Sequence, residues 1–148
     1  DVYKRQVRSL FDYFEALAED SGITLGVKGA IGSIAADREM LTRALNNLLS
    51  NAIRHTPRGK SITVLLSQDE QWTTISVVNP GEKIPEPDLP KLFNRFYRVD
   101  PARQRNTAGA GLGLAIVKSI AEAHGGSVAV TSSELVTRFD LALPHLRQ

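Results

Sequence analysis

The 148-residue sequence contains no cysteine. This absence excludes disulfide bonds, thiolate metal sites and thiol-dependent catalysis. Hydrophobic residues make up 42% of the chain, but no apolar run approaches the roughly 18 residues that cross a bilayer, and no signal peptide opens it. Blocks of consecutive Lys and Arg are also absent, and the formal net charge is only +2. We therefore expect no nucleic-acid partner, whereas a small phosphorylated ligand is compatible with this charge.

The length and hydrophobic content fit one compact domain with a core of its own. The first residue is Asp1 rather than Met, so we expect a piece of a longer protein. Residues 1–6, DVYKRQ, do not lead naturally into the pattern that follows, and no fold prediction rests on them.

Apolar residues at helical spacing predict a first helix that ends at EDSG, residues 19–22. Because the stripe is one-sided and close to the start of the chain, we expect the tail of a longer helix that packs elsewhere. Without its helical partners this stripe would be exposed. Its members are Val7, Leu10, Phe11, Phe14, Leu17 and Ala18.

The remaining pattern mixes β-rich runs with helices and does not alternate as repeated βαβ units would. Asp37 is a good N-cap for a helix that reaches about His55, a short helix is expected around 92–96, and a third runs over 112–124. This order predicts an α+β fold, a two-layer sandwich of a mixed, mostly antiparallel sheet and helices. The predicted strands are 23–27 and 31–36 as one hairpin, 61–68 and 72–79 as another, then 127–132 and 137–144.

A polar row runs along the helix that begins after Asp37. Asn47, Asn51 and Arg54 share one face, while leucines form a separate stripe. Amide oxygens suit Mg²⁺ and a guanidinium suits phosphate oxygens, so this face can hold a metal-bound polyphosphate. A solvated helix face is the alternative.

Three further segments carry ligand-binding chemistry. GAGLGLA at 109–115 brings backbone N–H groups and a helix N-terminus together, as a phosphate site needs, although a flexible hinge is the alternative. NPGEKIP at 79–85 offers an acceptor oxygen for an exocyclic amine, or is an ordinary Pro-Gly turn. Arginines and aromatics alternate over 92–105, before or within a predicted mobile loop at 99–110. These arginines either close over a triphosphate or are solvated.

The order and spacing of these four segments resemble the catalytic ATP-binding domain of sensor histidine kinases. In that family they are the N, G1, F and G2 boxes, and the fold is the Bergerat sandwich with a long ATP lid. The resemblance covers about 23–144, and 79–105 looks especially like the heavy-metal sensor subgroup. It implies that residues 1–22 are the tail of the second dimerisation helix and that 23–148 form the catalytic domain.

The resemblance also implies the site residues. Asn51 matches the Mg²⁺ ligand, and Asn47, Arg98 and Arg103 match groups that act on the phosphates. The implied nucleotide-binding residues are Asn51, Arg54, His55, Asn79, Gly81, Ile84, Phe96, Gly109, Gly111, Leu112 and Gly113.

The chain departs from the family pattern at three places in the implied site. Asn79 stands where most members have an Asp, and Lys83 stands where a glycine is usual. ELVT at 134–137 replaces a last glycine motif.

By this resemblance the chain is an enzyme, the catalytic fragment of a histidine protein kinase that uses ATP and Mg²⁺. ATP-hydrolysing relatives have a Glu at the place of Asn47, and an uncharged amide cannot act as a general base. None of His55, His124 and His145 lies in a phosphoacceptor setting, so the acceptor histidine is expected on an absent dimerisation domain. The implied partners are that domain and a response regulator. The implied parent is a membrane-bound homodimer with this domain on the cytoplasmic side of a bacterial inner membrane.

Other functions remain open at this point. A serine kinase of the same superfold and a non-catalytic nucleotide-binding module both fit the residues. A ligand-free interaction domain fits them least, because four ligand-type segments in this order are hard to explain without a nucleotide.

Overall fold

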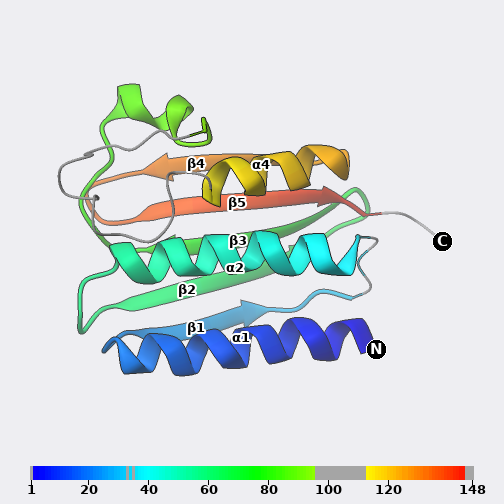
Figure 1. Ribbon diagram of the computed structural model, residues 1–148, viewed down its shortest axis with the longest axis horizontal. Coiled ribbons are helices and arrows are strands. Elements are labelled where there is room, and N and C mark those ends of the chain that lie inside the picture. The colour runs from blue at the N-terminus through cyan, green and yellow to red at the C-terminus, as the bar shows by residue number, and fades with distance from the viewer. Residues whose placement is uncertain (1, 33, 35, 96–112, 146–148) are drawn as a thin grey trace.

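The structure, a computed structural model, describes residues 2–32, 34, 36–95 and 113–145, with side chains from Arg8 onward. One layer is a five-stranded sheet in the order β1-β2-β3-β5-β4. Helices α1, α2 and α4 lie over one face of this sheet (Figure 1). The predicted α+β sandwich is therefore confirmed. The elements are α1 (Val2–Asp20), β1 (Thr24–Gly29), α2 (Arg38–His55), β2 (Ser61–Gln68), β3 (Trp72–Asn79), the 3₁₀ helix η1 (Glu86–Lys91), α4 (Gly113–Ala123), β4 (Ser127–Ser132) and β5 (Thr137–Pro144).

The sheet is mixed, with one parallel pair at its edge. β1 runs parallel to β2, whereas β2, β3, β5 and β4 pair antiparallel. The predicted hairpin of 61–68 and 72–79 is confirmed with these bounds, as are the two closing strands. Inward positions alternate with outward ones along each strand, so that β3 and β5 direct Ile75, Val77 and Leu141 into the core.

The predicted hairpin of 23–27 with 31–36 is wrong. Residues 31, 32, 34 and 36 are not in a strand, and β1 instead pairs with β2 after the crossover through α2. The strand ends at Gly29, which has a φ of 88°. A Cβ atom there would lie only 2.1 Å from the carbonyl oxygen of Leu66. Only glycine suits this position, because the φ is left-handed and a side chain would collide with the paired strand β2.

The first helix packs on this domain, contrary to the expectation that its apolar stripe packs elsewhere. Phe11, Phe14 and Ala18 are 6%, 1% and 0% exposed and belong to the main core cluster. The reason is that β1 is an edge strand whose inner face needs cover, and α1 lies over it (Figure 1). Leu17 keeps 37% of its surface exposed. The helix also extends back to Val2.

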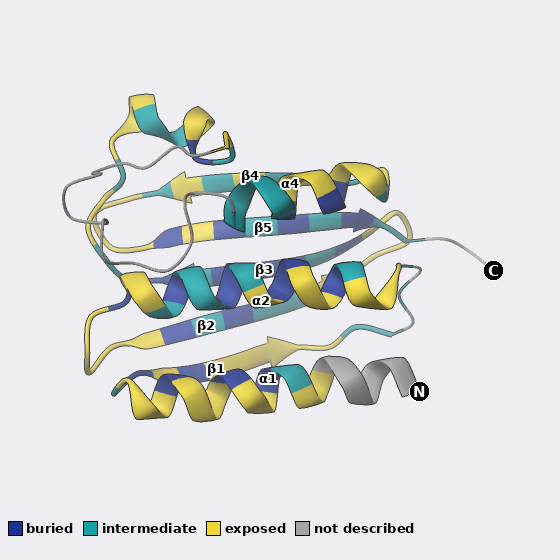
Figure 2. Ribbon diagram, in the orientation of Figure 1, coloured by how far each residue is buried: buried dark blue, intermediate teal, exposed yellow. Residues whose placement is uncertain are grey.

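The second helix forms as predicted and is capped at both ends. The Asp37 carboxylate accepts a hydrogen bond from the Met40 N–H at 2.9 Å, which satisfies one free amide of the first turn. At the other end the Thr56 hydroxyl donates to the Ala52 carbonyl at 2.6 Å. Buried, intermediate and exposed residues follow one another along α2 (Figure 2), as expected for a helix that turns one face to the core. The buried residues are Leu41, Ala44, Leu45, Leu48, Leu49 and Ala52.

The short helix predicted around 92–96 is displaced. The helical segment is η1, which starts after Pro85 and ends before Leu92, and Phe96 lies outside the described residues. Prolines suit the start of a helical turn because their missing N–H has no partner there. Among the described helices none combines the length and apolar character of a membrane span.

Candidate functional site

The polar row of α2 is set by the burial of its leucine stripe. Because Leu45, Leu48 and Leu49 face the sheet, Asn47 and Asn51 fall at the margin of the buried face and are half-buried. Arg54 and His55, one turn later, are exposed. The predicted face therefore exists as a partly enclosed surface and not as a fully solvated one.

The first residue of α4 lies directly beside this row. A Cβ atom on Gly113 would lie 3.9 Å from both Cβ and Cγ of Asn47. The structure thus brings together two predicted site residues that are 66 positions apart in the sequence (113 minus 47). A helix N-terminus at this point supplies free amide donors and a favourable dipole for an anion.

The amide nitrogen of Asn47 is buried and has no hydrogen-bond partner in the described residues. A buried donor without an acceptor is uncommon and costs free energy. An anionic oxygen placed between Asn47 and the start of α4 would satisfy it. This unpaired donor is the feature of the site that points most directly to a ligand.

The turn after β3 closes against the C-terminal end of α2. A Cβ atom on Gly81 would lie 3.0 Å from the carbonyl oxygen of His55 and 3.7 Å from the amide nitrogen of Asn79. Asn79 itself is only 4% exposed, and its Nδ2 donates to the Pro80 carbonyl at 3.0 Å. That bond uses one N–H of the amide, and Oδ1 is the atom of this side chain that can accept from a ligand amine.

The electrostatics at this end of α2 favour a neutral imidazole. Partial withdrawal of the ring from water, followed by the positive charge of Arg54, lowers the pKa of His55 below its ordinary value. A neutral ring is suited to lie beside an uncharged base or sugar.

The structure also shows two hydroxyl groups that sequence reasoning missed. Ser132 on β4 accepts a hydrogen bond from the Ile84 N–H at 2.9 Å, and its Oγ lies 2.8 Å from Oγ1 of Thr137. Ser132 continues the inward positions of Val128 and Val130, where the alternation calls for an apolar residue. That break in alternation was the available signal.

Lys83 and Val136, which lie at two of the departures from the family pattern, are both exposed. The predicted residues that lie outside the described part of the chain are Phe96, Arg98, Arg103, Gly109, Gly111 and Leu112.

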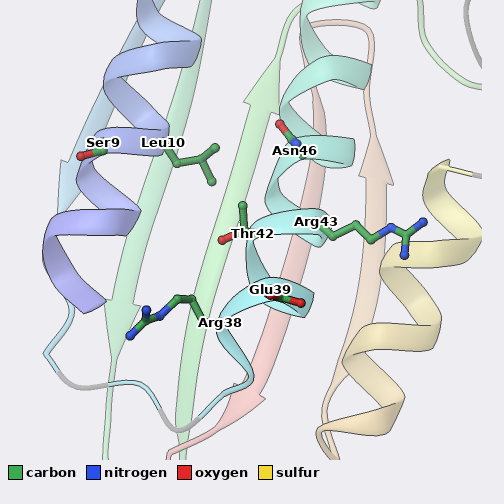
Figure 3. Close-up of a pocket in the computed structure, with 7 residues that line it drawn as sticks. All are labelled: Ser9, Leu10, Arg38, Glu39, Thr42, Arg43 and Asn46. Carbon is green, nitrogen blue, oxygen red and sulfur yellow. The ribbon is translucent and has the colours of Figure 1, made fainter. Parts of the chain in front are cut away.

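A hollow of about 560 Å³ lies elsewhere, between α1 and α2. Figure 3 shows that Arg38 and Arg43 point in opposite directions there, so their charges do not converge on one ligand. We therefore place the candidate site at the polar row of α2 and not in this groove. The groove is lined by Ser9, Leu10, Arg38, Glu39, Thr42, Arg43 and Asn46.

The side chains of the candidate site suit a Mg²⁺ ion that is bound mainly by the phosphate oxygens of a ligand. Within the described residues there is no group of three or more His, Cys, Asp or Glu side chains that could hold a metal. Mg²⁺ commonly keeps most of its shell as water and phosphate oxygens and needs one or two protein oxygens. The Asn51 amide oxygen is suited to that part.

Comparison with known proteins decides the family. Residues 36–147 match the model described as "Histidine kinase-, DNA gyrase B-, and HSP90-like ATPase". The chain belongs to this family. It is 53% identical over 139 residues to the sensor histidine kinase CusS of Escherichia coli strain K12. The match covers 94% of this chain but 29% of CusS, so the chain spans less than a third of that relative.

Solved structures agree with this assignment. The mycobacterial sensor histidine kinase MprB superposes with a TM-score of 0.80 at 29% identity, over 93% of this chain and 95% of that one. The catalytic domain of histidine kinase ThkA gives a TM-score of 0.82 at 28% identity, over 95% and 91% of the two chains. The resemblance to the catalytic domain of sensor histidine kinases, including the heavy-metal subgroup, is confirmed.

Proposed function

We propose that this domain binds Mg²⁺-ATP between α2, the turn after β3 and the start of α4, and donates the γ-phosphoryl group to a histidine on a dimerisation domain. The observation that carries the proposal is the buried Nδ2 of Asn47, which has no hydrogen-bond partner within the described part of the chain and lies beside the first residue of α4. The family to which the chain belongs is described as ATPases, and this supports ATP as the nucleotide.

The chain's own residues act mainly by positioning and by matching charge, which is what phosphoryl transfer requires. Asn47 donates to a phosphate oxygen, and the N-terminus of α4 at Gly113 favours the negative charge next to it. Arg98 and Arg103 contact the phosphates in this proposal. Bound Mg²⁺, held by Asn51, supplies further neutralisation of the phosphate charge. A bond forms between the histidine nitrogen and the γ-phosphorus while the bond to the bridging oxygen breaks, which leaves ADP.

The adenine end of the ligand lies at the turn after β3. Asn79 Oδ1 accepts from the exocyclic amine, because it is the only acceptor atom of this side chain, while Nδ2 donates to the Pro80 carbonyl. Gly81 packs so closely on the His55 carbonyl that only a small residue fits there. Arg54, His55, Ile84, Phe96, Gly109, Gly111 and Leu112 complete the proposed nucleotide-binding set.

Hydrolysis of ATP by this site should be slow. Asn47 stands at the place from which a carboxylate would activate water, and an amide has no such basicity. Transfer to a delivered nucleophile is therefore favoured over transfer to water. A non-catalytic nucleotide-binding module is the second candidate, favoured by the uncharged Asn79 and by ELVT at 134–137 in place of a last glycine motif.

We propose that residues 1–22 are the end of the second dimerisation helix and that 23–148 form the catalytic domain. The dimerisation domain of the same protein and a response regulator are its partners. The parent is a homodimer anchored in a bacterial inner membrane, with this domain in the cytoplasm.

Calorimetric titration with a non-hydrolysable ATP analogue, with and without Mg²⁺, tests the site. Mg²⁺-dependent binding should be lost in Asn51→Ala and kept in Asn46→Ala, a matched amide deletion on the exposed side of the same helix. Equal loss in both variants, or in neither, would contradict the assignment of Asn51.

Phosphoryl transfer separates the two candidate functions. The isolated chain should not phosphorylate itself, but with γ-labelled ATP it should label an added dimerisation domain from a relative such as CusS. Binding without transfer to any supplied acceptor would favour the non-catalytic module.

A further inference from the structure

The turn that carries Gly81 is tied to a distant strand by a side-chain hydroxyl. The Ile84 N–H donates to Ser132 Oγ at 2.9 Å across 48 positions of sequence. Ser132 Oγ is in turn 2.8 Å from Thr137 Oγ1. Because Thr137 pairs with Ser132 on one side and with Asn79 on the other, this link joins the turn back to the end of the strand from which it leaves.

The hydroxyl pair lies in a largely enclosed environment. Thr137 and Asn79 are 5% and 4% exposed, and Ser132 is half-buried. Water therefore replaces a lost partner less readily here than on the open surface. The bond between Ile84 and Ser132 should accordingly count in fixing the turn.

A small pocket of about 170 Å³ lies between the turn, η1 and β4, although Ile84 and Leu89 also pack against the core. Side chains that border such a space make fewer contacts on that side. The hydrogen bond to Ser132 therefore matters more for holding the turn in one conformation. The pocket is lined by Lys83, Ile84, Glu86, Leu89 and Ser132.

We propose that Ser132 is a positioning residue for the adenine end of the site. Its hydroxyl holds the turn over 80–85 against β4, so that Asn79 Oδ1 and the backbone at Gly81 keep the places that receive the base. This inference rests on the proposed nucleotide-binding function. It adds a residue outside the four sequence segments that define the site.

A pair of near-isosteric variants isolates the hydroxyl. Ser132→Thr keeps the acceptor oxygen, whereas Ser132→Val replaces it with a methyl group of similar size. Thr131→Ala, on the exposed outer side of the same strand, is the matched control. Each variant is titrated calorimetrically with Mg²⁺-ADP, and its amide hydrogen exchange and thermal unfolding are followed by NMR and circular dichroism.

Ser132→Val should weaken ADP binding about tenfold, the change expected for loss of one neutral hydrogen bond. Exchange should speed up at Ile84 and its neighbours in the turn. Ser132→Thr and Thr131→Ala should stay within about twofold of the parent, a change of less than 0.5 kcal/mol. A purely structural role would instead speed up exchange throughout β4 and β5 and would lower the unfolding temperature.

The outcomes also separate this inference from the function on which it rests. If the parent does not bind ADP, the proposed function fails and the positioning role fails with it. If the parent binds ADP and Ser132→Val binds it equally well, the positioning role alone is overturned. Weakened binding in Ser132→Thr to the level of Ser132→Val would overturn it as well, because the hydroxyl would then not matter.

Discussion

His124 connects the end of α4 with the beginning of α2 through Asp37. Its Nε2 accepts the Asp37 N–H at 2.9 Å, and its Nδ1 is 2.8 Å from the Ile120 carbonyl oxygen. The second contact requires the proton on Nδ1, which leaves Nε2 free to accept. One neutral imidazole thus joins the two helices whose facing residues, Asn47 and Gly113, form the phosphate side of the candidate site.

We expect His124→Ala to lower the free energy of unfolding by about 0.5–1.5 kcal/mol, the net contribution of a typical hydrogen bond, because the Asp37 N–H exchanges its imidazole partner for water. Urea unfolding at neutral pH, followed by circular dichroism, measures the change. Lys118→Ala, on the exposed side of the same helix, should change stability by less than about 0.5 kcal/mol. Equal stability of His124→Ala and the parent would show that this contact does not hold the helices together.

Phe14→Ala tests whether α1 is an integral part of the fold. Phe14 is 1% exposed in the core between α1 and the sheet, so we expect a loss of about 3–5 kcal/mol of unfolding free energy. Leu17→Ala is the matched change on the same helix, at a side chain that is 37% exposed, and should cost less than about 1 kcal/mol. Similarly small losses of unfolding free energy for both variants would mean that α1 contributes little to the stability of the domain.

Local patterns in the sequence predicted the elements better than their partners. The β-rich runs 61–68 and 72–79 predicted the bounds of β2 and β3, and Asp37 marked the start of α2. The partner of β1 was predicted wrongly, because a short β-rich run does not specify which strand completes it. The observed pairing of β1 with β2, such as Gly29 opposite Leu66, is between residues far apart in the sequence.

The same contrast holds at the candidate site. Side-chain chemistry and family resemblance predicted Asn47, Gly81 and Gly113 as site residues. The structure places Gly113 beside Asn47, and Gly81 against the C-terminal end of α2. Ser132 was missed because its role depends on a hydrogen bond to Ile84 that exists only after β4 has paired with β5. Residues that act by contact with a ligand are visible in a motif, whereas residues that position a turn need the folded chain.

Gly113→Ala separates stability from ligand binding. An added Cβ would make ordinary contact with Asn47 at 3.9 Å, and alanine favours a helix over glycine by up to about 1 kcal/mol. We therefore expect unchanged or slightly raised stability together with weaker binding of Mg²⁺-ATP analogues, since the methyl group occupies space that the phosphates need. Thermal unfolding and calorimetric titration of the same sample measure both quantities. Unchanged affinity would place the phosphates away from the start of α4.

A glycine-to-alanine change at Gly81 provides the contrast. There the Cβ would lie 3.0 Å from the His55 carbonyl oxygen, so the turn must shift and we expect both stability and affinity to fall. A Gly81→Ala variant with parental stability would show that the turn moves at little cost in free energy. The close packing of Gly81 on α2 would then not fix the adenine end of the proposed site.

The titration of His55 reports on the environment at the C-terminal end of α2. Withdrawal from water and then the charge of Arg54 lower its pKa below 6.5 in the folded chain. As the pH falls through that value, the unfolded chain takes up a proton at this imidazole more readily than the folded chain, so this group lowers stability in acid and contributes nothing above it. NMR titration of the ring should give a value below 6.5 in the parent and a higher one in Arg54→Gln. Bound Mg²⁺-ATP should change it only weakly, because the proposed phosphate positions at Asn47 and Gly113 lie about two helical turns from His55. A strong rise of the pKa on binding would place the negative charge beside His55, because nearby negative charge favours the imidazolium, and the proposed placement of the nucleotide along α2 would need to be reversed.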